Sequence, residues 1–349
     1  VRRFEGFWLF LVLLIFYIFG KGGLKTERIM KKIFVLMFMA AITGGCGKEK
    51  DKDPVPQVRI GTVERIENFD SQYFDSRNVD VWLPQGYDPQ KSYPILYMHD
   101  GQMLFDSSIT WNNQEWGVDE VMGELIRNNQ MEPCLVVGIW NSGETRHADY
   151  FPQKPFESLP QNIQDSLINA VRQESDRPIF STQIRSDAYL KFLVKELKPH
   201  IDNHYSTRKD RKHTFVAGSS MGGLISWYAM CEYPGVFGGA ACLSTHWIGT
   251  FRSENNPIPG AFMDYLKKHL PDPATHKIYF DYGTKTLDAT YEPYQKQVDT
   301  IMQSRGYGPE NWKTMKFPGA DHSEHAWRKR LDIPLTFLLG KNPSNSARQ

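Results

Sequence analysis

The sequence has almost no excess charge of either sign. Its 41 Lys and Arg balance 40 Asp and Glu, which gives a formal net charge of +1 over 349 residues. Proteins that bind nucleic acid through bulk electrostatics carry a clear basic excess, so we expect no nucleic-acid partner. With 40% apolar and 13% aromatic residues, the chain can form a packed core and lacks the composition of a disordered protein.

Cysteine is also scarce, and no metal-binding pattern accompanies it. The four residues are Cys46, Cys134, Cys231 and Cys242, with no Cys-x-x-Cys pair. Without Cys46, which lies near the N-terminus, an odd number remains, so a complete disulfide framework is excluded. Cys134 and Cys242 lie in apolar runs and are predicted to be buried thiols. Because no His-Glu-x-x-His sequence occurs, we expect no metal, and no organic cofactor is implied.

The first apolar run, FWLFLVLLIFYIFG, has 14 residues, fewer than the ~20 that a membrane-spanning helix needs. We interpret residues 1–29 as an over-extended N-terminus and Met30 as the initiator. Residues 30–45 have the Lys-Lys start, apolar centre and small residues of a signal peptide. The small residues before Cys46 resemble a bacterial lipoprotein signal with Cys46 lipidated, and a plain signal peptide or a short anchor is the alternative.

Two further segments are predicted to lie outside the folded domain. Residues 46–57 are charged and contain proline, which indicates a tether, and residues 341–349 form a tail. Together with the leader, they predict an exported protein of the cell envelope, an outer-membrane lipoprotein or a periplasmic protein. Its contact with the membrane is then made only through the N-terminal lipid or leader.

Between residues 58 and 340, short apolar runs alternate with helical patterns, which predicts one α/β domain with a mostly parallel sheet and helices on both faces. The polar, proline-containing stretch 141–182 is predicted to be an insertion over the site, partly helical near 161–173. The expected strands are 79–84, 93–101, 133–140, 213–220, 238–244, 277–283 and 313–319. The expected helices are 116–127, 185–205, 224–231, 288–305 and 324–339.

The stretch VAGSSMGGL contains Gly-x-Ser-x-Gly at Gly218, Ser220 and Gly222. A serine hydroxyl is a weak nucleophile at neutral pH and needs a base, an orientation and a site for oxyanion charge. Gly-x-Ser-x-Gly orients the serine when it joins a strand to a helix, and here TFVA precedes it as a strand and LISWYAM follows it as a helix. Ser220 is therefore the predicted nucleophile, and Ser219 is interpreted as a small packing residue.

Three motifs occur in the order found in one family. VAGSSMGGLISWYAMCEYPGVFGGAACLS, LYMHDGQMLFD and FPGADHSEHAWRKRL resemble the esterase family of α/β-hydrolases that includes esterase D-like, siderophore-ester, feruloyl and acetyl-xylan esterases. The resemblance covers about 58–339. It implies the α/β-hydrolase fold and a triad in the chain order serine, acid, histidine.

His322 directly follows the last expected strand, where this fold places its base, whereas His325 is expected to pack or face solvent. Asp288, in the loop after KIYFDYG, is the predicted acid that orients His322. Asp281, within that strand, is the alternative.

The oxyanion is expected to bind two backbone N–H groups. One belongs to Met221, the residue after the nucleophile. The other belongs to Gln102 or Gly101, with Gln102 favoured by the family resemblance. Residues that flank strand ends are the candidates for substrate contact, where Arg146 would pair with a substrate carboxylate or with a local acid: Trp140, Asn141, Arg146, Tyr150 and Trp247.

These features predict a serine carboxylic-ester hydrolase that works through an acyl-enzyme intermediate on a small-molecule or glycan-linked ester. An acyltransferase with the same triad is an alternative that the sequence leaves open. A non-catalytic glycan- or ligand-binding lipoprotein is a second alternative, which the presence of Ser220, Asp288 and His322 disfavours. A serine peptidase is disfavoured because no propeller or second large domain precedes the hydrolase region.

Overall fold

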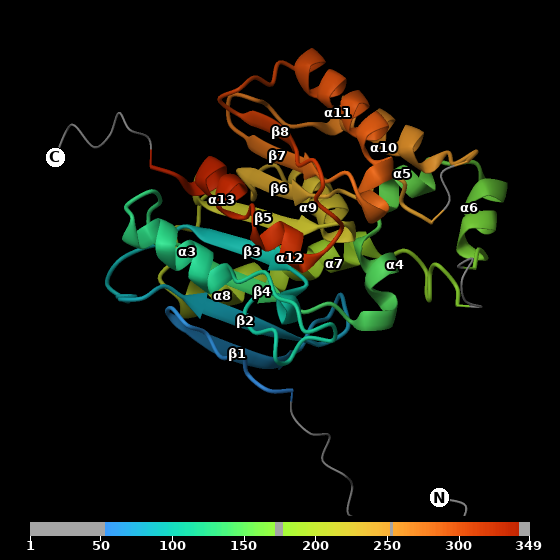
Figure 1. Ribbon diagram of the computed structural model, residues 1–349. Helices are drawn as coiled ribbons and strands as arrows, with labels where there is room; N and C mark the ends of the chain where they lie inside the picture. The colour runs from blue at the N-terminus through green and yellow to red at the C-terminus, as the bar shows by residue number, and fades with distance from the viewer. Residues whose placement is uncertain (1–52, 172–176, 252–253, 342–349) are drawn as a thin grey trace, which may run out of the picture. The chain divides into compact units, whose positions relative to one another are not determined.

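The computed structural model describes residues 53–171, 177–251 and 254–341, and we describe the compact unit to which residues 55–341 belong (Figure 1). The predicted leader, Cys46, most of the tether and nearly all of the tail lie outside these residues. None of the helices in the described ranges combines the length and apolar character that crossing a bilayer requires.

The described residues form one eight-stranded sheet with the strand order β1-β2-β4-β3-β5-β6-β7-β8. β2 pairs antiparallel with β1 and with β4, and all the other neighbours are parallel. The mostly parallel sheet expected from the sequence is thereby confirmed. The strands are β1 (Thr62–Phe69), β2 (Arg77–Leu83), β3 (Ile95–His99), β4 (Leu135–Ile139), β5 (Thr214–Ser219), β6 (Gly239–Leu243), β7 (Lys277–Tyr282) and β8 (Trp312–Lys316).

Helices cover both faces of the sheet (Figure 1). One face carries α3 (Val118–Arg127), α12 (Glu324–Arg328) and α13 (Asp332–Leu339). The other face carries α7 (Ser186–Phe192), α8 (Lys198–His204), α9 (Met221–Glu232), α10 (Ile258–His269) and α11 (Glu292–Ser304). Buried strands of this kind read as continuous apolar runs because each face meets its own helical layer.

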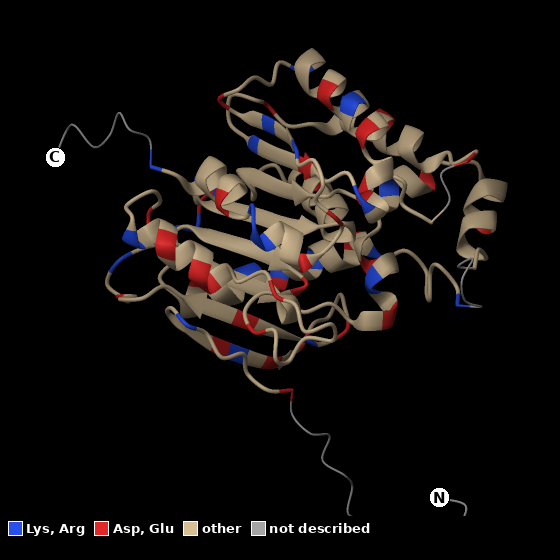
Figure 2. Ribbon diagram, in the orientation of Figure 1, with Lys and Arg blue, Asp and Glu red and all other residues tan. Residues whose placement is uncertain are grey.

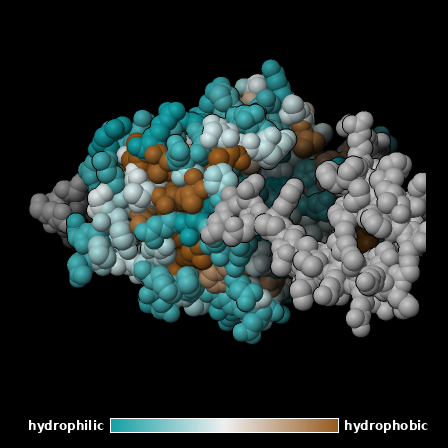
Figure 3. Space-filling model, turned by 90° about the horizontal axis from the view of Figure 1, so that it is seen from below, coloured by the Kyte–Doolittle hydropathy of each residue, from teal (hydrophilic) through white to brown (hydrophobic). Residues whose placement is uncertain are grey.

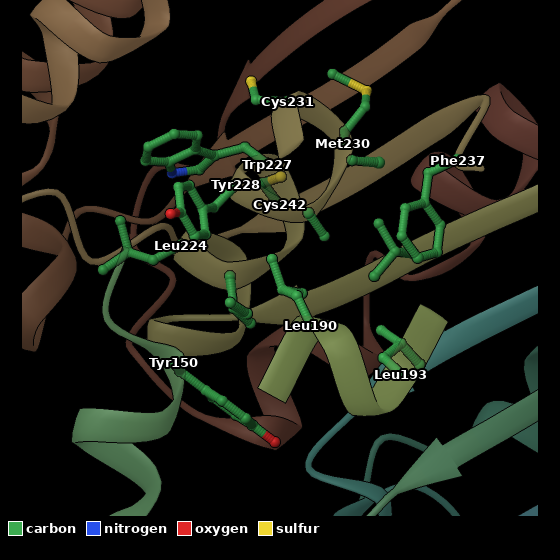
Figure 4. Packing of buried hydrophobic residues seen from close by; sticks show 14 of the residues in the cluster. Tyr150, Leu190, Leu193, Leu224, Trp227, Tyr228, Met230, Cys231, Phe237 and Cys242 are labelled. Atoms are coloured by element: carbon green, nitrogen blue, oxygen red, sulfur yellow. The ribbon is translucent and has the colours of Figure 1, made fainter. Parts of the chain in front are cut away.

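The strands divide their side chains between two hydrophobic cores. In β3, Tyr97 belongs to the core under α9, while Leu96 and Met98 belong to the core under α3 and α13. This alternation follows from the two-residue period of a strand. Figure 4 shows the larger core, where Trp227 of α9 lies among side chains of neighbouring elements. Each fully buried Val, Leu, Ile, Phe or Met side chain of this core stabilises the fold by about 1.5–3 kcal/mol relative to leaving it exposed.

Two predicted helices are interrupted. The stretch 185–205 is divided by a wider π-helical turn, Leu193–Leu197, between α7 and α8. Pro199 lies in the first turn of the next helix, α8. Its ring lacks an N–H and clashes with the carbonyl four residues earlier, which explains the wider turn. The stretch 324–339 is likewise two helices, and Pro334 lies in the first turn of the second one.

Two elements have no counterpart among the sequence predictions. β1 is an edge strand whose side chains are exposed or half-buried, so it lacks an apolar run. α10 begins with Ile-Pro-Gly, which reads as a turn, although proline is tolerated in the first turn of a helix.

The insertion at 141–182 contains three short helices in its described part. They are α4 (Arg146–Tyr150), α5 (Gln153–Glu157) and α6 (Gln161–Ile168). Arg146, at the start of α4, bonds to the residue that follows β3, so the segment lies over the carboxyl end of the sheet. Residues 172–176 lie outside the described residues, and Gln173 is among them.

The surface is mixed in character. Figure 2 shows Lys and Arg interspersed with Asp and Glu on the helices, in keeping with the small net charge. Figure 3 shows hydrophobic patches between hydrophilic residues on the face that lies below in Figure 1. Exposed apolar residues are normal on a protein surface, so they indicate a binding site only where a second observation supports it.

Candidate active site

Ser220 lies in a sharp turn between β5 and α9, with φ 59° and ψ −120°. Such a backbone is costly for a residue with a side chain and persists where the surrounding structure enforces it. A Cβ added to Gly218 would lie 2.8 Å from the backbone of Gly222, so this close approach requires glycine. The strand–turn–helix context predicted for Gly-x-Ser-x-Gly is confirmed, and Ser219 is the buried last residue of β5.

His322 and Asp288 meet across a wide sequence separation. Asp288 lies in a 3-10 helix, Thr286–Thr290, that follows β7, and His322 lies in the turn after β8. His322 Nδ1 is 2.5 Å from Asp288 Oδ1, and its backbone N–H donates to Thr286 Oγ1 at 2.8 Å. The Asp288 side chain is fully buried, while 11% of the His322 side chain is exposed. The imidazole is therefore held at Nδ1 by Asp288, and part of the side chain is accessible to solvent.

The other carboxylate considered from the sequence has a different partner. Asp281 forms hydrogen bonds with Arg330 Nη2 at 2.9 Å and with the Ser244 N–H at 3.0 Å. Burial raises the pKa of Asp281, and the Arg330 guanidinium acts against this rise. Of these two acids, the structure therefore brings Asp288 to His322.

Ser244, which the sequence analysis missed, holds the second oxygen of Asp288. Its hydroxyl donates to Asp288 Oδ2 at 2.6 Å and accepts N–H groups from Trp327 at 3.0 Å and Arg330 at 2.9 Å. The Gly283 N–H also donates to Asp288 Oδ2, at 2.5 Å. The donor and both acceptor positions of the hydroxyl are thus used. Its place directly after β6, at the same sheet edge, was the available sequence signal.

Tyr291 lies near both His246 and His322. Its hydroxyl lies 2.7 Å from His246 Nδ1, and its ring centre lies 5.9 Å from that of His322. Burial raises the pKa of Tyr291 and so does Asp288, while a hydrogen bond with Ser220 acts in the opposite direction. Burial, together with nearby imidazoles, lowers the pKa of His246, so this histidine is neutral at ordinary pH.

The turn after β3, whose N–H groups were predicted to bind the oxyanion, has a tightly constrained backbone. Asp100 adopts a left-handed conformation (φ 61°, ψ 45°) and is followed by a 3-10 turn, Gly101–Met103. A Cβ on Gly101 would lie 2.4 Å from the carbonyl carbon of Gly138, so only glycine fits there. Because β3 and β5 are parallel neighbours, Gln102 and the first residue of α9, Met221, follow strand ends at the same sheet edge.

This turn is fixed by two residues that were predicted to contact substrate. Arg146 makes a bidentate ion pair with Asp100, with both N–O distances 2.7 Å, and Asn141 Nδ2 donates to the same carboxylate at 2.7 Å. The Asn141 N–H donates to Gln102 Oε1 at 3.1 Å. Burial acts to raise the pKa of Asp100, but the Arg146 guanidinium, the Asn141 hydrogen bond and the nearby His99 together outweigh it, and the pKa is lowered. Arg146 thus pairs with a local acid, one of its two predicted partners.

The two tryptophans on the predicted substrate list donate their indole N–H groups to the protein itself. Trp140 donates to Asp80 at 2.7 Å, and Trp247 donates to Gln295 at 2.9 Å. Trp247 is 1% exposed and stacks on Trp227, with ring centres 6.0 Å apart. Their predicted contacts with substrate remain predictions.

The described residues contain no group of three or more His, Cys, Asp or Glu that could hold a metal ion. Cys134, Cys231 and Cys242 are buried and unpaired, as expected for the first and third of these.

A sequence model of the family described as "Putative esterase" matches residues 71–337. This match spans more than half of the sequence, and the chain belongs to this esterase family. It is a serine ester hydrolase with the α/β-hydrolase fold.

Two relatives illustrate how far this likeness extends. The uncharacterized protein YbbA of Bacillus subtilis is 22% identical over 277 residues, which cover 77% of this chain and 95% of YbbA. An endo-1,4-beta-xylanase/feruloyl esterase of Xylanibacter ruminicola is 24% identical over 290 residues, covering 79% of this chain but 31% of that protein. The chain therefore spans about a third of this second relative.

Solved structures share the fold. The enterobactin esterase FES from Shigella flexneri superimposes with a TM-score of 0.56 and 18% identity, over 81% of this chain and 60% of that chain. A ferulic acid esterase gives a TM-score of 0.54 and 17% identity, over 80% of this chain and 98% of that one. At this identity the likeness concerns the fold, which is the α/β-hydrolase fold expected from the sequence.

Proposed function

We propose that the protein hydrolyses carboxylic esters with the triad Ser220, His322 and Asp288, through an acyl-enzyme intermediate. The observation that carries this proposal is the 2.5 Å contact between His322 and Asp288 at the sheet edge where the strained Ser220 turn lies. A buried carboxylate at Nδ1 fixes the tautomer that leaves Nε2 as the base, and it stabilises the imidazolium that forms.

The reaction follows from these positions. Ser220 Oγ attacks the ester carbonyl carbon while His322 Nε2 accepts the hydroxyl proton. The carbonyl oxygen becomes an oxyanion that accepts hydrogen bonds from the N–H groups of Met221 and of Gln102 or Gly101. His322 then passes its proton to the leaving alcohol oxygen, and the C–O bond breaks. Water, deprotonated by His322, releases the acid and restores Ser220.

The substrate is a small-molecule or glycan-linked ester, and the protein acts outside the cytoplasm. The first part is supported by relatives named as a feruloyl esterase and an enterobactin esterase. The second rests on the leader at residues 30–45 and on Cys46 as the predicted lipid attachment site. An acyltransferase would use the same triad and differ only in the acceptor, so added alcohols would be acylated in competition with water.

A fluorophosphonate probe and p-nitrophenyl acetate test the proposal together. We expect the probe to label Ser220, located by peptide mass spectrometry, and we expect turnover of the acetate. Ser220→Ala should lose both while keeping its circular dichroism spectrum, and Ser219→Ala is the matched control that should keep both. A folded protein with neither label nor turnover would instead support the non-catalytic binding protein.

A further inference from the structure

Tyr291 is a buried residue that contacts the proposed nucleophile and has no role in the proposed reaction. Its side chain is 0% exposed, and its backbone N–H donates to the carbonyl of Asp288 at 3.0 Å. Its hydroxyl forms a hydrogen bond with the Ser220 side chain and lies 2.7 Å from His246 Nδ1. The direction of these two hydrogen bonds decides what Tyr291 does to Ser220.

The segment that carries His246 is fixed to the serine turn. The Ser220 N–H donates to the carbonyl of Leu243, the last residue of β6, at 2.9 Å, and the His246 N–H donates to the Ser220 carbonyl at 3.2 Å. His246 is 2% exposed, and its ring centre lies 5.9 Å from that of Tyr291. Ser220, His246 and Tyr291 therefore form one packed cluster.

The protonation of His246 fixes the direction of its hydrogen bond with Tyr291. Burial and two neighbouring imidazoles lower the pKa of His246, so one ring nitrogen carries a proton and the other a lone pair. A hydrogen bond with the Thr250 backbone acts to raise this pKa, as a carbonyl that accepts a ring N–H does. Because Nδ1 faces Tyr291, that N–H is at Nε2, and Nδ1 carries the lone pair. The Tyr291 O–H therefore donates to His246.

This direction leaves only lone pairs on the Tyr291 oxygen for Ser220. The contact is then made by the Ser220 hydroxyl, which donates its single proton to Tyr291. Such a donor acts to lower the pKa of a tyrosine, and Ser220 acts on the pKa of Tyr291 in this direction. Attack on an ester requires the same proton to point at His322 Nε2. Tyr291 and His322 therefore compete for it.

Tyr291 does not replace His322 as the base. A neutral phenol oxygen is a much weaker base than an imidazole, and the imidazole behind it, His246, is buried with a lowered pKa. His322, by contrast, has Asp288 at Nδ1 to stabilise the imidazolium. Proton transfer is favoured only after the hydroxyl has turned to His322, so Tyr291 holds the hydroxyl without activating it.

We infer that Tyr291 is a positioning residue that accepts the Ser220 hydroxyl in the free enzyme, in competition with His322, and so sets the fraction of molecules in which the serine is ready to attack. This inference rests on the proposed ester hydrolysis. When the hydroxyl turns to His322, its proton passes to Nε2 as the Oγ–carbon bond forms, and Tyr291 keeps its own proton. Removing the Tyr291 hydroxyl should therefore make Ser220 more reactive.

The rate of labelling by a fluorophosphonate measures this reactivity directly, and Tyr291→Phe keeps the ring while removing the hydroxyl. We expect the second-order labelling rate constant to rise about two- to tenfold, the range that corresponds to one net hydrogen bond. The kcat/KM for p-nitrophenyl acetate should rise too, and more at pH 5 than at pH 8. A stronger bond from Ser220 to His322 competes better with protonation of the imidazole, which moves the low-pH limb of the profile to lower pH.

Two further variants separate the effect of the hydroxyl from a general loosening of the site. His246→Asn keeps an oxygen acceptor for the Tyr291 O–H and should raise the labelling rate by less than Tyr291→Phe does. Tyr307→Phe removes another buried phenol hydroxyl, which donates to the Pro271 carbonyl at 3.0 Å, and should leave labelling and turnover unchanged. A lower or unchanged labelling rate in Tyr291→Phe, the same gain at both pH values, or an equal gain in His246→Asn would each overturn the inference.

The wild-type protein separates a failure of this inference from a failure of the proposed hydrolysis. If it is labelled at Ser220 and cleaves the acetate, but Tyr291→Phe is no faster, the positioning role is wrong and the esterase proposal stands. If only Tyr291→Phe is labelled, the inference is supported, because Tyr291 then holds nearly all of the serine hydroxyl. If both proteins are folded by circular dichroism and neither is labelled, the hydrolysis proposal fails and this inference fails with it.

Discussion

The hydroxyl of Ser244 donates a 2.6 Å hydrogen bond to the oxygen of Asp288 that does not face His322. The carboxylate is therefore held at both ends, by the histidine on one oxygen and by Ser244 and the Gly283 N–H on the other. This arrangement fixes the carboxylate plane and, through it, the imidazole. In the proposed mechanism, Ser244 acts on the chemistry only through Asp288, as a positioning residue.

Removing the Ser244 hydroxyl should therefore affect both activity and stability. In Ser244→Ala the N–H donors of Trp327 and Arg330 lose their acceptor, which should lower the free energy of unfolding by about 1–3 kcal/mol. We expect kcat to fall by about tenfold, with KM nearly unchanged, because a looser Asp288 orients His322 less well. Urea unfolding and steady-state kinetics measure the two effects. Ser226→Ala, which removes another buried hydroxyl bonded to Gly222, should cost stability alone.

The two buried aspartates should respond differently to loss of charge. Asp288→Asn should lower kcat by about 10²–10⁴, because the amide favours the wrong tautomer and cannot stabilise the imidazolium. Asp281→Asn should retain most of kcat but lose about 3–5 kcal/mol of stability, because the buried Arg330 guanidinium loses its counter-charge. Full activity in the first variant together with an inactive, folded second variant would transfer the acid's role to Asp281.

The ion pair between Arg146 and Asp100 should control the oxyanion turn. In Arg146→Met the buried carboxylate is left without its bidentate partner, so we expect a loss of about 3 kcal/mol of stability and a fall in kcat of about tenfold. Arg146→Lys keeps the positive charge but not the two parallel hydrogen bonds. Relative to Arg146→Met, it should therefore regain only part of the lost stability and part of the lost kcat. Arg127→Ala breaks an exposed pair with Glu124 and is the control, with little expected change.

Stability should decrease as the pH falls below about 6.5, the ordinary value for histidine. Burial lowers the pKa of His99 to about 3. Between these two values the unfolded chain binds a proton that the folded protein does not, so the free energy of unfolding falls by up to about 1.4 kcal/mol per pH unit for this histidine. Burial lowers the pKa of His246 too, which adds in the same direction.

Urea unfolding between pH 6 and pH 5, above the titration of most carboxylates, measures this slope. His99→Asn should flatten it, because the variant removes the group that takes up the proton on unfolding. His269→Asn, which removes an exposed histidine, is the control. An unchanged slope in His99→Asn would contradict the assignment of the pH dependence to this residue.

The sequence by itself determined the features that depend on short-range geometry. Gly-x-Ser-x-Gly between an apolar strand and a helix predicted the tight turn, in which the structure shows Gly218 close to Gly222 and a positive φ at Ser220. The alternation of buried strands and helices likewise indicated the sheet and its two helical layers. β1 and α10 were not predicted, because an exposed edge strand has no apolar run and a helix that starts with Ile-Pro-Gly resembles a turn.

Only the tertiary structure decided which distant side chains meet. Asp288 and Asp281 lie seven residues apart and are both buried, and the sequence left both open as partners of His322. The packing of α12 and α13 against the sheet brings Arg330 to Asp281 and leaves Asp288 to the histidine. The packing of the insertion over the end of β3 likewise gives Arg146 a partner, Asp100, within the chain. Local patterns follow from the sterics of neighbouring residues, whereas ion pairs and hydrogen-bond networks follow from how strands and helices far apart in sequence pack together.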